Sequence, residues 1–467
     1  MFTKCSFKIL VSAFLSVLAC SVWAQGYEPY YTLDEMPDAS VFLPCPPAFE
    51  SAGFATDFMR WQWGRSVRYS DRGSMASDDS EFGVDRMAKI FGPIFGIDIS
   101  EEGTPAIWKL IYRVGTTGRL SVTKAKAKYM RVRPFTKMNE HTFGKHDDEE
   151  SLRYNGSYPS GHTVFGWSVA LAMAELVPEY QDTILCRGLL YGDSRVIVGA
   201  HWQSDVDAAR LAASASLAKM HTSPAYRHDL VEARKEFAKL KEVKAVKIDT
   251  RLPNGQKILS APAPNNSYEY YGDVAKLWLA QYDCDSIRKL QAFMDADLSD
   301  TALMKGFSPC LHIVLSNKST PCIAALLSTA TQTIMRESFE LGESFFRERP
   351  CAESQDIALA HDGQEHNTLS SFPSEQAAVG WGLALLLAEI APSLQDSIML
   401  RGFEYGRSGI ITGDHYSSDA QAGRIMASYI YTQLHNNSGF QALLVAAKKE
   451  YASVSQKAET PPDEHKK

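Results

Sequence analysis

Hydrophobic residues recur along most of this 467-residue chain at intervals of three and four, the spacing of helices with one buried face. From Ala48 to Leu120 the Phe, Trp, Ile and Leu positions follow this spacing, and residues 164–172 form a continuous apolar run directly after a Pro-Ser-Gly turn. Alternating charges over Tyr226–Leu240 predict a closing helix. Strand patterns with a period of two are scarce, so the pattern predicts an all-α fold, a helical bundle.

The first 24 residues have the pattern of a secretory signal peptide. Lys4 and Lys8 supply the positive region, residues 9–19 supply the apolar stretch, and Val22-Trp23-Ala24 is an acceptable cleavage site. Cleavage there would leave a mature chain that starts at Gln25 and lies in the periplasm. A lipoprotein site that leaves Cys20 lipidated, and so anchors the protein to the outer membrane, is the alternative.

Length and composition indicate the number of domains and the class of protein. At 467 residues the chain is long enough for two domains, and its apolar (45%) and charged (22%) contents are those of a globular protein. The net charge of −7 predicts no nucleic-acid-binding surface. After the first 24 residues no further apolar run reaches the length of a transmembrane helix. Paired Cys-x-x-Cys or His-Glu-x-x-His ligand motifs are absent, so we expect no metal and no other cofactor.

Six cysteines follow the signal region, and export would place them where disulfides persist. Four of them fall in the second half of the chain, which is therefore the half in which we expect disulfides. Their pairing is left open by the sequence. The six are Cys45, Cys186, Cys284, Cys310, Cys322 and Cys351.

The second half of the chain repeats the first. Thr104-Pro105 recurs as Thr320-Pro321, and Arg133-Pro134 recurs as Arg349-Pro350, both 216 positions later. Four further matches are 214 positions apart: Pro159-Ser160 with Pro373-Ser374, Trp167 with Trp381, His201 with His415, and Asp205 with Asp419. A single shift of two residues aligns the halves, which predicts a tandem duplication. We expect domains over 25–241 and 267–452, a polar linker over 242–266, and a disordered tail over 453–467.

The strongest chemical signal lies at Gly156-Ser-Tyr-Pro-Ser-Gly-His-Thr163, where the turn leads into the apolar run. A helix that begins there would present the backbone N–H groups of Ser160 and Gly161 to an anion. Gly161 lets a ligand approach the backbone closely, and His162 adds a titratable side chain beside it.

Two flanking segments supply matching charges. Lys126 and Arg133 are seven residues apart, so on one helix, ended by Pro134, they would share a face and grip the same anion. Downstream, Arg195 adds a third cation. His201 and Asp205 stand at i and i+4, a spacing at which the carboxylate can fix the imidazole tautomer on a helix. Together these residues predict a phosphate site with a histidine on each side.

Lys-x6-Arg-Pro, Pro-Ser-Gly-His and Ser-Arg-x5-His-x3-Asp, in this order, resemble the three-part signature of the type 2 phosphatidic acid phosphatase superfamily. The longer strings around them closely resemble the bacterial class A non-specific acid phosphatases over about residues 26–240. The resemblance implies a metal-independent acid phosphatase with broad specificity for phosphomonoesters. In that reading His201, oriented by Asp205, is the nucleophile that forms a phosphohistidine, and His162 is the general acid. Lys126, Arg133, Ser160, Gly161 and Arg195 bind the phosphate.

Three other functions use the same residues. Vanadium haloperoxidases have much the same pocket, and a phosphohistidine can also be transferred to an alcohol, which would make the enzyme a phosphotransferase. A periplasmic phosphate-ester binding protein is the non-enzymatic alternative. Small phosphomonoesters are the expected partners in each phosphatase reading.

The second half departs from the signature at the positions that carry charge. Lys126 corresponds to Gly342, Gly161-His162 to Glu375-Gln376, and Arg195 to Gly409. The carboxylate of Glu375 would repel a phosphate, so we expect this half to be inactive. Because class A enzymes self-associate, the inactive half is expected to take the place of a second subunit, with a homo-oligomer as the other possibility.

Overall fold

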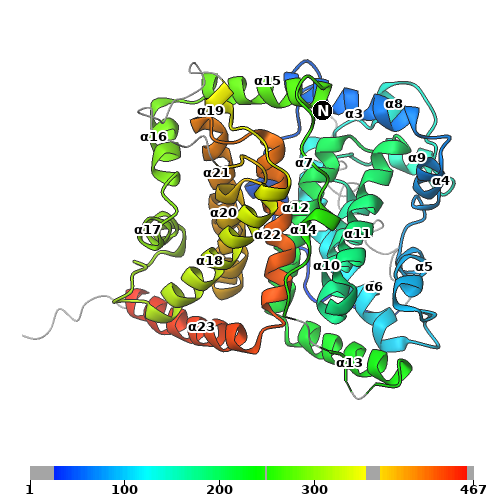
Figure 1. The fold of residues 1–467 in the computed structure, drawn as a ribbon. Helices are drawn as coiled ribbons and strands as arrows, with labels where there is room; N and C mark the ends of the chain where they lie inside the picture. Colours follow the sequence, from blue (N-terminus) through cyan, green and yellow to red (C-terminus); the bar gives the residue numbers. More distant parts are fainter. Residues whose placement is uncertain (1–25, 244, 248–249, 354–368, 460–467) are drawn as a thin grey trace, which may run out of the picture.

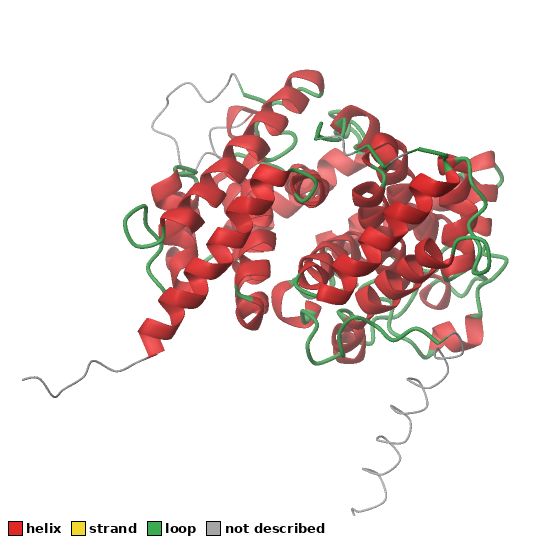
Figure 2. Cartoon of the chain, turned by 90° about the horizontal axis from the view of Figure 1, so that it is seen from below, coloured by secondary structure: helices red, strands yellow, loops and turns green. Residues whose placement is uncertain are grey.

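The computed structural model describes residues 26–243, 245–247, 250–353 and 369–459. Every regular element in these ranges is a helix, as Figure 2 shows, which confirms the all-α fold class. No helix in the described ranges is both long and apolar enough to cross a bilayer. The expected signal peptide, with Cys20, and residues 460–467 of the expected tail lie outside the described residues.

Within its described residues, the first half of the chain contains one 3₁₀ helix and a set of α-helices whose longest members are α6, α10, α11, α12 and α13 (Figure 1). The elements are α2 (Ala39–Phe42), α3 (Ala52–Ser66), α4 (Asp71–Asp78), α5 (Val84–Phe95), α6 (Pro105–Leu120), α7 (Thr123–Tyr129), α8 (Pro134–Lys137), α9 (Glu149–Arg153), α10 (Gly161–Leu176), η1 (Pro178–Tyr180), α11 (Gln181–Ile197), α12 (Gln203–His221) and α13 (Pro224–Leu240).

The second half follows the succession of the first from α14 onward: α14, α15 and α17 begin 216 positions after α2, α3 and α5, and η3 lies between α20 and α21 as η1 lies between α10 and α11. One difference is that α18 is a single helix where the first half has α6 and α7. The elements are α14 (Gly255–Ile258), α15 (Tyr268–Tyr282), α16 (Ser286–Asp295), α17 (Asp300–Leu311), α18 (Pro321–Ser344), α19 (Pro350–Glu353), α20 (Glu375–Ile390), η3 (Pro392–Leu394), α21 (Gln395–Thr412), α22 (Ser417–Leu434) and α23 (Ser438–Glu459).

Matching residues start matching helices in the two halves. Both α6 and α18 begin with proline at the first helical position, where its missing N–H costs nothing. The Glu236 carboxylate accepts hydrogen bonds from the next two backbone N–H groups of α6, and Glu450 does the same for α18. These two glutamates are 214 positions apart, in register with the repeat seen in the sequence.

The two halves pack through the helices at the centre of the molecule. Helices α10 and α12 lie against α20 and α22 (Figure 1), and one hydrophobic core includes buried residues of both halves. Hydrogen bonds cross this junction: Trp381 Nε1 donates to Ser214 Oγ (3.1 Å), and Gln433 Nε2 donates to the Ala174 carbonyl oxygen (3.2 Å). The halves therefore form one packed body within a single chain.

The segment expected to be a linker, residues 242–266, packs against both halves of the molecule. Ile258 and Leu259 are buried in the core, and the Asn254 N–H donates to Asp182 of the first half. Helix α14 packs against α11 and α18, so this segment is docked between the halves because it carries apolar residues within its polar sequence.

The disordered tail was expected to begin at residue 453, but this boundary is too early. Helix α23 continues to Glu459, because Tyr451 and Val454 pack on the core along one helical face. The six cysteines are unpaired in the structure, so the expected disulfides are not seen; the cysteines are spread over separate helices and loops.

Candidate active site

The segment with Lys126 and Arg133 is not one helix, contrary to the sequence prediction. Helix α7 ends at Tyr129, Met130 adopts a left-handed conformation (φ 40°), and Pro134 starts α8 instead of ending a helix. A proline disfavours helical geometry in the residue before it, and Arg133 accordingly is extended. The two cations nevertheless meet, because the Lys126 Nζ and the Arg133 guanidinium both reach the Gly156 carbonyl oxygen, at 2.6 and 3.5 Å.

Arg133 is buried and is held by backbone oxygens. Its Nε donates to the carbonyls of Leu152 and Asn155, and its Nη1 donates to the carbonyl of Ala200 (3.0 Å). Burial, followed by the nearby charge of Arg195, lowers the pKa of Arg133 to about 10. A guanidinium fixed by neutral acceptors keeps its full charge available for an anion.

His201 lies in the turn before α12, not on the helix that the i, i+4 reading assumed. The preceding Gly199 has a positive φ of 83°, which allows the chain to reverse after α11. His201 is 1% exposed, and its Nε2 accepts a hydrogen bond from Arg133 Nη1 at 2.9 Å. Since a guanidinium only donates, Nε2 carries a lone pair and the imidazole proton is on Nδ1.

The Nδ1 side of His201 faces two acceptors. The Asp205 carboxylate lies 3.4 Å from Nδ1, and the Ser157 carbonyl also bonds the ring. Burial, then the charges of Arg133, Lys126 and Arg195, keep the pKa of His201 well below its usual range. The imidazole is therefore neutral, with its reactive nitrogen directed at the cations.

Asp205 has a larger role than the sequence indicated. Its Oδ1 accepts from Arg131 Nη1 (2.6 Å) and its Oδ2 accepts from the Trp202 backbone N–H (2.8 Å), which caps α12. Arg131 also donates to Asp57 Oδ2 on α3 (2.8 Å). The close partner of Asp205 is thus Arg131, and the contact with His201 is the longer one. Neither Arg131 nor Asp57 was among the predicted site residues.

Helix α10 begins where the sequence predicted, with Ser160 as its N-cap. The Ser160 side chain accepts from the Thr163 N–H (3.2 Å), but the Ser160 N–H donates to the Asp205 carbonyl oxygen (2.9 Å). The expected role of the Ser160 N–H in a phosphate cradle is therefore wrong: this donor ties α10 to α12. A Cβ on Gly161 would lie 3.6 Å from Lys126 Cε, so the glycine leaves room beside the cation.

His162 lies on the first turn of α10 and its Nε2 is 3.2 Å from the Ser80 carbonyl oxygen. It packs edge-to-face on Phe82, with ring centroids 4.8 Å apart. Burial, then the charge of Arg195, keep the pKa of His162 well below its usual range.

Arg195, on the last turn of α11, is fully buried (0% exposed). Its Nη2 donates to Asp147 Oδ1 at 2.6 Å, whereas its Nε and Nη1 are buried without a hydrogen-bond partner in the described structure. Buried donors normally have partners, so these two N–H groups indicate a missing acceptor. Arg195 also acts on the pKa of Arg133, His162 and His201. The structure therefore brings the predicted site residues together.

The equivalent place in the second half is filled by a carboxylate. Glu375 Oε1 accepts from Arg349 Nη2 (2.8 Å), and its Oε2 lies 3.4 Å from His415 Nε2. His415 Nδ1 donates to the Ser371 carbonyl (2.8 Å), so the ring is held as in the first half. Gln376, in the place of His162, donates to the Asp295 carbonyl oxygen (2.8 Å).

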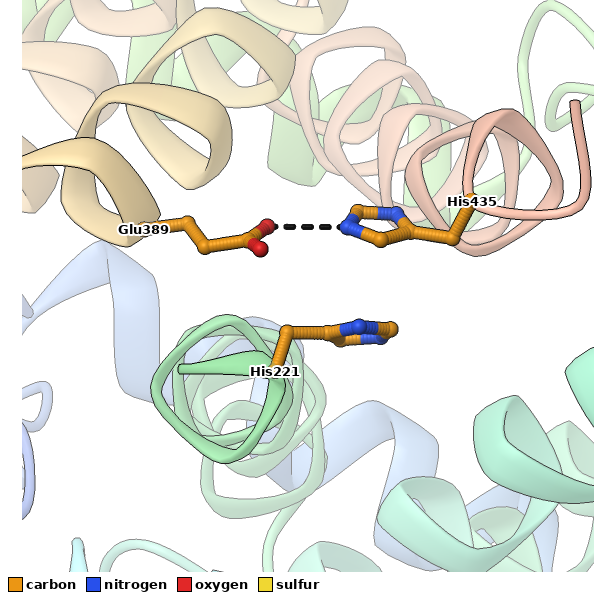
Figure 3. Close-up of side chains that lie close together, drawn as sticks. All are labelled: His221, Glu389 and His435. Carbon is orange, nitrogen blue, oxygen red and sulfur yellow. Dashed lines mark hydrogen bonds and ion pairs between the residues drawn. The ribbon is translucent and has the colours of Figure 1, made fainter. Parts of the chain in front are cut away.

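Outside these pockets, one group of three possible metal ligands is close together in the described part of the chain: His221, Glu389 and His435, buried at the junction of the halves (Figure 3). His435 Nδ1 faces the Tyr431 carbonyl (2.9 Å) and its Nε2 faces Glu389 Oε2 (2.8 Å). Two acceptors require a doubly protonated ring. The chemistry of this group therefore fits an ion pair, with the His221 ring tilted by 38° to the His435 ring and their centroids 3.9 Å apart.

Comparison with known proteins gives consistent matches. Residues 106–229 match the model of the PAP2 superfamily. The chain is 44% identical over 206 residues to a non-specific acid phosphatase of Providencia stuartii, which covers 44% of this chain and 83% of that protein. It is 37% identical over 215 residues to the non-specific acid phosphatase of Salmonella typhimurium (46% and 86%), and 35% identical over 219 residues to an acid phosphatase of Zymomonas mobilis (47% and 83%).

Proposed function

The chain belongs to the PAP2 superfamily, with the acid phosphatases, and we propose that it hydrolyses phosphate monoesters through a phosphohistidine on His201. The observation that carries this proposal is the 2.9 Å contact between Arg133 Nη1 and His201 Nε2. It places the lone pair of a neutral imidazole against a cation that can bind a phosphoryl oxygen. A bound phosphate would draw the guanidinium to itself and leave Nε2 free to attack phosphorus.

In the first step, His201 Nε2 forms a bond to phosphorus while the ester P–O bond breaks. Lys126, Arg133 and Arg195 neutralise the phosphoryl oxygens, with the N–H groups at the start of α10 as further donors. The departing oxygen takes a proton from His162. In the second step a water attacks phosphorus, His162 accepts the water proton, and the N–P bond breaks to release phosphate and His201.

The protonation of His162 depends on the substrate. Without an anion, the nearby cations disfavour an imidazolium at this position. A phosphate dianion bound among Lys126, Arg133 and Arg195 offsets most of that positive charge and favours the protonated acid. This coupling is a physical reason for an acid pH preference. A phosphohistidine can also be captured by an alcohol, so phosphotransfer is the secondary activity at high acceptor concentration.

The test is hydrolysis of 4-nitrophenyl phosphate at acid pH, with a chelator present, by the wild type, His201→Ala and His415→Ala. The two histidines are equivalent in the repeat, so the second variant is a matched control. We expect chelator-resistant turnover that is lost in His201→Ala and kept in His415→Ala, with an acid-labile phosphoenzyme in the wild type. Turnover by His201→Ala near the wild-type rate would exclude this nucleophile.

The second half is proposed to be an inactive copy that arose by tandem duplication and now acts as a built-in partner. This is supported by matching helix starts, the shared core and the ion pair between Glu375 and Arg349. Loss of activity in His415→Ala would refute the inactive assignment.

Residues 1–24 are proposed to direct export to the periplasm and to be removed there. Their charged start and apolar stretch support this. Sequencing the N-terminus of the mature protein should find Gln25, whereas a lipid-modified Cys20 would show the lipoprotein alternative to be correct.

A further inference from the structure

Arg119 is a cation at the edge of the active site that the mechanism above does not use. It lies near the end of α6, and its Nε would be 3.8 Å from a Cβ placed on Gly161. The same Cβ would be 3.6 Å from Lys126 Cε. Arg119 thus borders the start of α10 next to the phosphate-binding residues, and its charge lowers the pKa of both Lys126 and His162.

Unlike the other site arginines, Arg119 has no hydrogen bond or carboxylate partner for its guanidinium among the described residues. Arg131 is paired with Asp57 and Asp205, and Arg195 with Asp147. The guanidinium of Arg119 instead lies over the Phe82 ring, 4.6 Å from its centroid. Burial lowers its pKa, yet a guanidinium remains charged under all ordinary conditions. The N–H groups of an unpaired guanidinium are available to donate charge-assisted hydrogen bonds to an anion.

The second half shows that Arg119 varies with the catalytic residues. Its counterpart, 216 positions later, is Met335, and the counterpart of Phe82 is Leu298. Both are lost where Lys126, His162 and Arg195 are also lost. The buried ion pair of Arg131 with Asp205, in contrast, recurs as Arg347 with Asp419. Arg119 is therefore lost together with the phosphate-binding cations, whereas the buried ion pair is kept.

The position of Arg119 indicates which end of the substrate it contacts. Phe82 packs its ring both under Arg119 and against His162, the proposed proton donor to the leaving oxygen. The three other cations serve the transferred phosphate. We propose that Arg119 binds a second anionic group on the leaving group, so that the preferred substrates are phosphomonoesters with a further phosphate close to the scissile one. This inference rests on the proposed function and names its substrate class.

The test compares two substrates that differ only in the second anion: propyl phosphate and propane-1,3-diol bisphosphate. Values of kcat/KM are measured for the wild type, Arg119→Met and Arg119→Lys. Arg336→Met, on the exposed face of α18, is the control. We expect the preference for the bisphosphate to fall about 10- to 100-fold in Arg119→Met, the range for a charge-assisted hydrogen bond, mainly through KM. Arg119→Lys should keep part of it, and Arg336→Met all of it.

Equal losses on both substrates would overturn the inference, because Arg119 would then serve the transferred phosphate itself. A loss on neither substrate in Arg119→Met would overturn it as well. Both outcomes are separate from failure of the proposed function, which is judged by whether turnover of propyl phosphate by the wild type requires His201.

Discussion

The carboxylate of Glu375 lies where the second half would hold a phosphate, and replacing it by glycine should reopen an anion site. Glu375→Gly recreates the residue of the first half, Gly161, at the first position of α20. The change removes both the 2.8 Å ion pair with Arg349 and the 3.4 Å contact with His415. A sulfate ion, which stays doubly charged across the useful pH range, should then bind to these two side chains.

The stability lost in Glu375→Gly, and the part that bound sulfate restores, can be worked out from the contacts that remain. Breaking a buried ion pair costs about 3–5 kcal/mol, and Asp414 Oδ1, 3.8 Å from Arg349 Nη1, offsets part of this. Sulfate at 100 times its Kd would restore about 2.7 kcal/mol. The reopened site lacks the counterparts of Lys126 and Arg195. Two missing charge-assisted hydrogen bonds weaken binding by about 3–6 kcal/mol, or about 10²- to 10⁴-fold relative to the first half.

The assay is the free energy of unfolding against sulfate concentration for the wild type, Glu375→Gly and Glu375→Gln. Glutamine removes the charge but still fills the pocket, so this variant also reports the general stabilising effect of sulfate. Only Glu375→Gly should show a second stabilising phase at the higher sulfate concentrations. Identical sulfate curves for the two variants would refute the reasoning that the Glu375 carboxylate stands in for a bound anion.

Two further predictions concern protons. Burial and then the cations around His162 lower its pKa, and a bound dianion should raise it. Sulfate binding should therefore take up a proton, and its Kd should rise by up to about tenfold per pH unit as the pH rises. Calorimetry in buffers of different ionisation enthalpy measures this uptake; a pH dependence that persists in His162→Gln would assign the proton to another group. At the junction of the halves, burial opposes the charge on His435, but Glu389 outweighs it and raises the pKa of His435. A raised pKa gives stability that is complete below about pH 6.5, the unfolded value, and is lost as the pH rises through the folded value. Glu389→Gln should therefore cost about 3–5 kcal/mol in urea unfolding at pH 6 and less at pH 9; an equal cost at both pH values would contradict the imidazolium.

The sequence predicted those parts of the site that depend on neighbouring residues. The Pro-Ser-Gly-His turn does start a helix, and Ser160 caps it as a serine in that position commonly does. The prediction failed where a tertiary contact competes with a local one. The Ser160 N–H would be free on an isolated helix, but the Asp205 carbonyl from α12 accepts its hydrogen bond.

The helix expected over Lys126–Arg133 failed for a local reason that the sequence did contain. Arg133 precedes a proline, and this position favours an extended backbone. Proline at the first position of α8 then starts a new helix. The seven-residue spacing suggested the right pair of cations for the wrong geometric reason: they meet at the Gly156 carbonyl and not on one helical face.

Contacts between segments far apart in the sequence could not be predicted from residue spacing within one half. Arg131 meets Asp57 across 74 positions, and His162 meets the Ser80 carbonyl across 82. The repeat, however, contains a signal for the first of these. Asp57, Arg131 and Asp205 all recur in register as Asp273, Arg347 and Asp419, with the same ion pairs.

That recurrence distinguishes residues that hold the fold together from residues that bind the substrate. A buried ion pair is expensive to break from one side, so each half must keep Arg131 and its carboxylates, or their counterparts, to hold α12 in place. Phosphate-binding cations are not constrained in this way, because their partner is the substrate. Once a half no longer binds substrate, its unpaired cations only repel one another, and they can be replaced by neutral residues such as Gly342 and Gly409, or neutralised by a carboxylate such as Glu375. Arg133 recurs as Arg349, which Glu375 neutralises, whereas Lys126, Arg195 and Arg119 are all replaced by uncharged residues in the second half.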